Sequence, residues 1–400
     1  MSLAFYLVDR MALHHYSRIV NRVAVGLLAI FVGLLGSCST REHDFLIYIG
    51  TYTGKGSDGI YLYRFNSNDG HLTPIGLAAK TENPSWLVID SSRQFLYSVN
   101  ETGEFQGKPT GSISAFSIDR ESGGLTALQQ ISSRGAAPCH LSIDRTGRHL
   151  MVANYTGGSA AIFPIEKNGQ LGVPGSFIQH AGFSVHPERQ NGPHAHSIQA
   201  TPDNRFVTVT DLGMDKVMVY PFDAENGSLD TLHPVKVTLP PGSGPRHLAY
   251  SRDGKSIYVL NELTSTVTVF SLNTKTGEMT PMQSEPILPD SFVGINTGAE
   301  ILVDATGKFL YVSNRGDNSI GLFSIEPVDG RLTPVEWFPS GGRGPRHMEI
   351  DPTGQWLMVA NQLSDNLALF KINSSDGRLT PAGKPQPVSA PVCVRFMPVQ

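Results

Sequence analysis

A phrase of about fifty residues recurs along the chain. Each copy contains a proline, an apolar strand, an Asp-x-x-Gly type of turn and a second apolar strand that ends in asparagine or aspartate, as in Pro138 to Asn154. The intervals between these strand ends run from 47 to 57 residues, counted from Gly50, which closes an incomplete first copy. Within residues 44–400 a second marker, Gly-x-Leu or Gly-x-Met, also occurs seven times, at Gly70, Gly123, Gly169, Gly227, Gly277, Gly330 and Gly377. Both markers therefore count seven copies.

Each copy is predicted to form four short strands, because apolar and polar residues alternate between turns that contain glycine. Four strands repeated at this interval are typical of a β-propeller blade. The repeat region begins with a second-strand phrase at Phe45 and ends with an unpartnered first-strand phrase, Pro391 to Phe396. We therefore predict an all-β, seven-bladed β-propeller over residues 44–400, as a single domain. Its C-terminal strand should complete blade one and close the ring, which leaves no open sheet edge there.

The first 37 residues have the pattern of an export signal. Arginines precede an apolar run, Val23 to Leu35, which is too short to span a bilayer stably. The segment Leu35 to Cys38 then resembles the lipobox of bacterial lipoproteins, in which the cysteine becomes the lipidated N-terminus. We predict a lipoprotein-type signal peptide at 1–37, lipidation at Cys38 and a short tether at 38–43. This predicts a bacterial cell-envelope protein, lipid-anchored or periplasmic, that contacts the membrane only through its lipid; plain secretion and an uncleaved anchor are the alternatives.

Several functional classes find no support in the sequence. The net charge of −4 offers no basic field for nucleic acid. No zinc motif, Rossmann or P-loop fingerprint or Gly-x-Ser-x-Gly elbow is present, and the Asp-Gly pairs indicate hairpin turns. We therefore expect no metal and no cofactor. Beyond Cys38 the only cysteines are Cys139 and Cys393, in non-adjacent copies, so no disulfide framework is expected.

The repeat separates structural residues from candidate functional ones, because a residue shared by most copies is explained by the blade. The asparagine that ends the second strand is structural by this criterion. The residue after it varies and is expected to ring one mouth of the central channel: Thr51, Glu101, Tyr155, Leu212, Glu262, Arg315 and Gln362. The position after the blade proline varies too, with Ser85, Cys139, His194, Arg246, Arg346 and Val392. The next position is histidine in three copies, which favours a structural role for His140, His247 and His347.

Copy four departs from the pattern. Pro193 to Thr201 spans eight residues, whereas Pro345 to Asp351 spans six. The extra residues predict a bulge or a longer approach that aims His194 and His196 toward the channel.

The unusual channel residues suggest a chemistry. Copies four to six contribute His196, Arg246, Glu262 and Arg315, which we predict to be catalytic. Arginine binds a carboxylate or phosphate bidentately, a neutral histidine moves a proton at neutral pH, and a glutamate beside arginine stays ionised. Such a set suits a small anionic lactone: water activated by histidine attacks the carbonyl, and arginine stabilises the oxyanion. We further predict that His194, Arg346 and His347 bind substrate.

An ordered series of motifs resembles a known family. The motifs include Gly50 to Gly54, Ala137 to Leu141, His186 to Gln190, Pro193 to Ser197 and Gly244 to His247. Together they are similar to those of the seven-bladed lactonases, which include propeller 6-phosphogluconolactonases and fungal carboxymuconate cyclases. The resemblance implies metal-independent ester chemistry in the channel. It also implies that the His, Arg, Glu, Arg set of the cyclases falls on the four predicted catalytic residues.

The leading hypothesis is a lactone hydrolase resembling 6-phosphogluconolactonase that opens a sugar-derived or other acidic lactone. The alternatives are a non-catalytic envelope propeller that binds a ligand or protein, a muconate-type lactonising cyclase, and a metal-dependent lactonase. The fold alone does not separate them. An enzyme requires the four predicted catalytic side chains to face one cavity, whereas a scaffold predicts them dispersed or buried in structural pairs.

Overall fold

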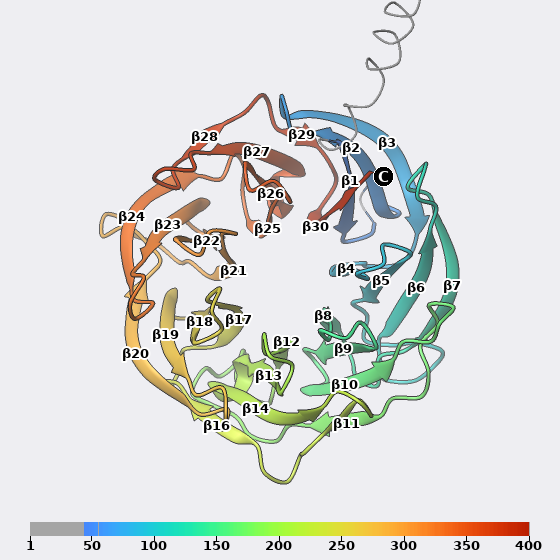
Figure 1. The fold of residues 1–400 in the computed structure, drawn as a ribbon, viewed down its shortest axis with the longest axis vertical. Helices are drawn as coiled ribbons and strands as arrows, with labels where there is room; N and C mark the ends of the chain where they lie inside the picture. Colours follow the sequence, from blue (N-terminus) through green and yellow to red (C-terminus); the bar gives the residue numbers. More distant parts are fainter. Residues whose placement is uncertain (1–43, 55, 400) are drawn as a thin grey trace, which may run out of the picture.

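The computed structural model describes residues 44–54 and 56–399 as seven antiparallel sheets around a central axis (Figure 1). The sheets follow one another around the ring, so each is one blade. The predicted seven-bladed propeller is confirmed. The predicted signal peptide, Cys38 and the tether lie outside the described residues. No helix in the described part is long and apolar enough to cross a membrane.

Blades two to four run outward from the axis in chain order, innermost strand first. Blade two consists of β4 (Leu87–Ile89), β5 (Phe95–Asn100), β6 (Ser112–Ile118) and β7 (Leu125–Ser132). Blade three consists of β8 (Pro138–Ile143), β9 (His149–Asn154), β10 (Ser159–Pro164) and β11 (Ser176–Gln179). Blade four consists of β12 (Ala195–Ala200), β13 (Phe206–Asp211), the 3-10 helix η1 (Leu212–Met214), β14 (Lys216–Asp223), β15 (Ser228–Leu229) and β16 (Val235–Thr238).

Blades five to seven repeat this order. Blade five consists of β17 (Pro245–Tyr250), β18 (Ser256–Asn261), β19 (Thr266–Leu272) and β20 (Met279–Pro286). Blade six consists of β21 (Gly298–Val303), β22 (Phe309–Asn314), β23 (Ser319–Ile325) and β24 (Leu332–Pro339). Blade seven consists of β25 (Pro345–Ile350), β26 (Trp356–Asn361), the 3-10 helix η2 (Gln362–Ser364), β27 (Asn366–Ile372), β28 (Leu379–Pro381) and β29 (Gln386–Pro387).

Blade one joins the two ends of the described chain. Its innermost strand is β30 (Pro391–Pro398), which pairs antiparallel with β1 (Asp44–Thr51), followed by β2 (Gly59–Asn66) and β3 (His71–Lys80). The pairing runs along the strands, from Phe45 opposite Pro398 to Thr51 opposite Pro391. The predicted closure is therefore confirmed. Cys139 and Cys393 are buried free thiols, as the spacing indicated.

The two sequence markers have clear structural roles. Gly169 has a φ of +81°, and a Cβ there would lie 2.2 Å from the Phe95 ring of the preceding blade. Its carbonyl accepts a hydrogen bond from the Tyr97 hydroxyl at 3.0 Å, so the marker glycine docks one blade against the next. The strand-end asparagines bond turn carbonyls, for example Asn154 Nδ2 to Ser133 O at 3.1 Å and Asn361 Nδ2 to Ser340 O at 3.0 Å. The structural interpretation of these asparagines is confirmed.

Candidate active site

The innermost strands carry an irregularity that aims one residue per blade at the channel. In β8, β12, β17 and β25 the pairing register shifts after the first residue, which leaves Cys139, His196, Arg246 and Arg346 as extra residues of a bulge. A bulge re-aims side chains and is common beside active sites. By register, the equivalents in the other three blades are Ser85, Ala299 and Val392. We call these seven residues the bulge ring.

A second ring follows the second strands. In all seven blades the first residue past that strand donates its backbone N–H to the carbonyl that precedes the blade proline or its equivalent, as Glu262 does to Gly244 at 2.7 Å. The shared bond defines equivalent positions. We call the set the strand-end ring, which contains Tyr52, Glu101, Tyr155, Leu212, Glu262, Arg315 and Gln362.

Two expectations about these rings are wrong. Thr51 does not belong to the strand-end ring: it pairs with Pro391 as the last residue of β1, and Tyr52 takes the ring position. The matching tyrosines Tyr48 and Tyr97, whose hydroxyls both bond a marker glycine, would have given the correct register.

The second wrong expectation concerns copy four. His194 is not equivalent to Arg246, because the two extra residues lengthen the loop before β12 and place His196 at the bulge. A register shift at this point also occurs in blades one, three, five, six and seven, so the bulge is not a peculiarity of blade four. His194 instead stacks on the Tyr155 ring, with the ring centroids 4.5 Å apart.

The centre of the site is one buried carboxylate surrounded by three arginines. Glu262 is 2% exposed; its Oε1 lies 2.6 Å from Arg189 Nη2, and its Oε2 lies 3.1 Å from Arg315 Nη2 and 3.4 Å from Arg246 Nη1. Burial opposes ionisation, but the charges of Arg315, Arg246 and Arg189 hold the pKa of Glu262 well below its usual range. The cluster keeps a net positive charge of two.

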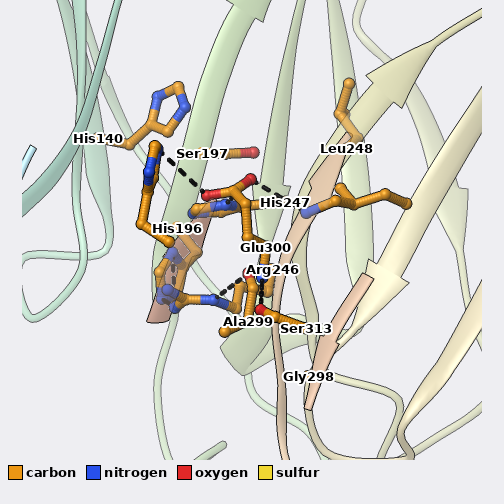
Figure 2. A network of polar contacts seen from close by, with 12 residues as sticks. His140, His196, Ser197, Arg246, His247, Leu248, Gly298, Ala299, Glu300 and Ser313 are labelled. Carbon is orange, nitrogen blue, oxygen red and sulfur yellow. Dashed lines mark hydrogen bonds and ion pairs between the residues drawn. The ribbon is translucent and has the colours of Figure 1, made fainter. Parts of the chain in front are cut away.

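His196 lies against Arg246, one member of this cluster (Figure 2). Arg246 Nη1 donates a hydrogen bond to His196 Nε2, and His196 Nε2 lies 4.0 Å from Glu262 Oε2. Burial, together with the positive charge of Arg246, lowers the pKa of His196 well below its usual value. The imidazole is therefore neutral at neutral pH. The structure therefore brings the four predicted catalytic residues together in one cluster.

Sequence reasoning missed one member of the cluster. Arg189 comes from the loop between β11 and β12, has no equivalent in other blades, and bonds both Glu262 and the Tyr155 hydroxyl, the latter at 3.1 Å. The internal comparison of copies could not find it, because a residue outside the repeat has no counterpart. Its only signal was the family-like motif His186 to Gln190.

Across the rings lies a second polar group from blades seven, one and two. Arg346 Nη2 donates to the Tyr52 hydroxyl at 2.6 Å, and its guanidinium lies 5.1 Å from the centroid of that ring. The Tyr52 hydroxyl in turn donates to Glu101 Oε2 at 2.8 Å. Among the residues that the structure describes, no carboxylate forms an ion pair with Arg346, in contrast to the three arginines on Glu262. Among the described residues, the positive charge of Arg346 is therefore not neutralised by an ion pair.

One residue further along each innermost strand, a third set closes the channel. We call it the floor ring: Trp86, His140, Ser197, His247, Glu300, His347 and Cys393. The Trp86 ring centroid lies 4.4 Å from that of His140 and 5.1 Å from those of His247 and His347. Glu300 accepts from His247 Nδ1 at 3.0 Å. These groups cover the underside of the cluster.

His347, which the sequence predicted to bind substrate, is a member of the floor ring. His347 is 1% exposed and contacts Trp86, Glu300 and Arg395. It lies in the floor ring, so the structure does not bring it among the bulge-ring side chains. Burial lowers the pKa of all three floor histidines well below the usual value, which leaves them neutral.

The arrangement places a neutral imidazole, three arginines and a fixed negative charge in one buried cluster above the floor ring. Within residues 44–54 and 56–399 no group of three or more histidine, cysteine, aspartate or glutamate side chains has an arrangement that could hold a metal ion. The described side chains by themselves supply a proton acceptor and hydrogen-bond donors for an oxyanion.

Comparisons with known proteins point to one family. Residues 46–396 match the model of the family described as lactonase, 7-bladed beta-propeller. The 6-phosphogluconolactonase of Bacillus subtilis (strain 168) is 36% identical over 303 residues, which is 75% of this chain and 83% of the relative. A 6-phosphogluconolactonase of Formosa agariphila is 33% identical and covers 76% and 86%. The solved structure of a periplasmic gluconolactonase from Pseudomonas aeruginosa is 35% identical, has a TM-score of 0.84, and covers 89% of this chain and 100% of its own.

Proposed function

The chain belongs to the family of seven-bladed β-propeller lactonases, and from this premise we propose that it hydrolyses an anionic, sugar-derived lactone by water attack assisted by His196. Lactonase-type hydrolysis follows from the family. The substrate and the roles of the side chains are our proposal. The observation that carries it is the convergence of His196, Arg246 and Arg315 on one buried carboxylate, Glu262.

The chemical step uses groups already in contact. The carbonyl oxygen of the lactone takes over the Arg246 donor that bonds His196 Nε2, which frees the Nε2 lone pair. Nε2 then removes a proton from water while the water oxygen forms a bond to the carbonyl carbon. The resulting oxyanion accepts hydrogen bonds from Arg246 and Arg315. When the ring C–O bond breaks, the imidazolium returns its proton to the leaving alkoxide.

Glu262 stabilises the positive charge that forms on His196 in this buried site. An imidazolium next to two arginines is unfavourable, and a carboxylate 4.0 Å from Nε2 offsets part of that cost. Glu262 also holds the three guanidinium groups in position, so that their donors point at the substrate without further reorganisation.

Arg346 accounts for the anionic character of the substrate. It lies across the rings from the reacting groups, on the same Tyr52 hydroxyl that bonds Glu101. A carboxylate or phosphate remote from the lactone carbonyl would bind its remaining donors, because guanidinium matches the planar geometry of such oxyanions. The substrate would then span the site from Arg246 to Arg346.

We further propose that the protein acts in the cell envelope. The export pattern at 1–37 and the lipobox-like Cys38 support this location. The similar Pseudomonas aeruginosa protein is described as a periplasmic gluconolactonase, which supports gluconolactone-type substrates outside the cytoplasm.

The test is hydrolysis of δ-gluconolactone and its 6-phosphate by the purified protein, corrected for spontaneous opening, with His196→Ala beside it. A general base contributes about 10²–10⁴-fold, so the variant should lose about that much of kcat and keep its thermal stability within a few degrees. Equal rates for both proteins would remove His196 from the mechanism. Absence of turnover across a lactone panel would favour the binding-protein alternative.

A further inference from the structure

A buried thiol lies beside His196. Cys139 is the bulge-ring residue of blade three and is 6% exposed. Its Sγ lies 3.7 Å from His196 Nδ1, 3.3 Å from the His196 carbonyl oxygen and 3.8 Å from the Ala195 carbonyl oxygen. The thiol therefore contacts the imidazole on the nitrogen opposite to the one that we assign as the base.

The hydrogen-bond partners of the His196 imidazole determine which of its nitrogens carries the proton. Arginine has only donors, so the bond from Arg246 Nη1 requires Nε2 to be an acceptor. In a neutral imidazole the proton must then sit on Nδ1, which has two neighbours: Arg246 Nη1 at 3.5 Å, which cannot accept a hydrogen bond, and the Cys139 sulfur, which can. The thiol stays protonated, because burial raises its pKa, and it donates its own proton to the His196 carbonyl. Each donor in the series of contacts from Arg246 through His196 to Cys139 therefore has an acceptor.

Resting on the proposed function, we propose that Cys139 is a positioning residue: its sulfur accepts the Nδ1–H of His196 and keeps Nε2 directed at the reacting water. The contact matters most during the reaction. When the substrate takes the Arg246 donor away from Nε2, the sulfur remains as the partner that prevents the ring from turning or changing tautomer. A buried Nδ1–H without a partner would be costly.

The repeat indicates that the fold does not demand a cysteine here. The equivalent positions hold residues as different as Ser85, Ala299 and Val392. Cys393, the other buried thiol, is in the floor ring and accepts the backbone N–H of Leu87 at 3.3 Å, far from any role at His196. It therefore offers a matched control for the cost of deleting a buried sulfur.

The experiment compares Cys139→Ala, Cys139→Ser and Cys393→Ala with the parent protein. We expect Cys139→Ala to lower kcat about 10-fold with KM within about twofold, because an orienting contact to a catalytic group is lost while substrate contacts remain. Serine retains an acceptor and a donor, so Cys139→Ser should keep kcat within about threefold of the parent. Cys393→Ala should change kcat by less than about twofold, at a comparable loss of thermal stability.

A second readout does not depend on turnover. In protein labelled with ring-¹⁵N histidine, with His196 assigned by its loss in His196→Gln, the parent should show the Nδ1–H tautomer above pH 7. Cys139→Ala should shift the two nitrogen signals toward averaging, and Cys139→Ser should restore them. Unchanged ¹⁵N signals and kinetics in Cys139→Ala, an Nε2–H tautomer in the parent, or an equal kcat loss in Cys393→Ala would each overturn the proposal.

The two proposals fail in different ways. A parent protein that opens no lactone but shows the Nδ1–H tautomer, sensitive to Cys139, would refute the hydrolytic function and leave the cysteine–histidine contact intact. An active parent whose His196 signals ignore Cys139 would refute the positioning role alone.

Discussion

The bulge ring and the floor ring lie one residue apart on the same strands, yet their histidines have different surroundings. His196 in the bulge ring contacts Arg246 and lies 4.0 Å from Glu262. The floor histidines pack instead around Trp86, two of them with ring centroids 5.1 Å from it. All are buried, and burial keeps all of them neutral. Charged neighbours occur in both rings, since Glu300 lies beside His247 and His347. What sets His196 apart is that the carboxylate beside it binds three arginines, whereas Glu300 forms no ion pair with an arginine among the described residues.

The largest difference between the two rings is expected when the carboxylate beside each set of histidines is neutralised. Glu262→Gln leaves three buried guanidinium groups without their counter-charge, so we expect about 3–5 kcal/mol loss of stability and about 10³-fold loss of kcat/KM. Glu300→Gln in the floor keeps an acceptor for His247 Nδ1 and removes no arginine partner, so stability should change by about 1 kcal/mol or less. Thermal unfolding and lactone kinetics of both variants check this. Equal losses of stability and of kcat/KM in the two variants would contradict the distinction between the two carboxylates.

A second prediction concerns acid. The folded-state pKa of His140, His247 and His347 is lowered, so below about pH 6.5 the unfolded chain binds protons that the folded chain does not. Stability should therefore be fully present above that pH and fall as the pH drops, by up to about 1.4 kcal/mol per pH unit for each histidine.

The carboxyls limit the pH window. Burial raises the pKa of Glu300 and Glu349, so the folded chain holds protons on these carboxyls that the unfolded chain releases, and this opposes the histidine effect as the pH falls. The histidine slope is therefore clearest just below about pH 6.5. Urea unfolding at several pH values checks the slope, and His347→Gln should reduce it by one histidine's share. An unchanged slope in that variant would show that the floor does not resist protonation.

The third prediction separates binding from chemistry within the upper rings. Arg346→Gln should raise KM for a lactone with a carboxylate or phosphate about 10–100-fold, because a charge-assisted bond is lost. KM for a neutral lactone and kcat for both should stay within about threefold. Arg343→Gln is the matched control, because Arg343 is an exposed arginine in the loop just before β25 and bonds the Leu363 carbonyl. A loss shared equally by neutral and anionic lactones would assign Arg346 to the reaction itself.

The smallest effect is expected at Tyr52. Tyr52→Phe removes the hydroxyl that links Arg346 to Glu101 but keeps the ring under the guanidinium. One hydrogen bond of about 1 kcal/mol predicts a three- to fivefold increase in KM for the anionic lactone. Tyr61→Phe in the same blade, whose hydroxyl accepts from the Asp58 backbone N–H, should leave KM unchanged. Identical KM values in all three proteins would remove the hydroxyl from anion binding.

Much of the fold was predictable because a repeated unit reports its own structure seven times. Strand order, blade number and closure by β30 all follow from the spacing of two markers and the mismatched ends. The same comparison located Arg246, Glu262 and Arg315 as deviations at equivalent positions. It erred by one residue at Thr51 and by two at His194, because turns of different length change the register without changing the strand pattern.

Sequence by itself determined the ring of seven blades and the kind of side chain available at its axis, since alternation and turn glycines are local properties of each copy. Only the tertiary structure decided which charges meet. Arg189 reaches Glu262 from a loop 73 residues away, and Cys139 reaches His196 from the neighbouring blade. Such contacts depend on ring closure and on the bulges that turn side chains inward, and neither the distance between blades nor the direction of a side chain is encoded in spacing along one strand.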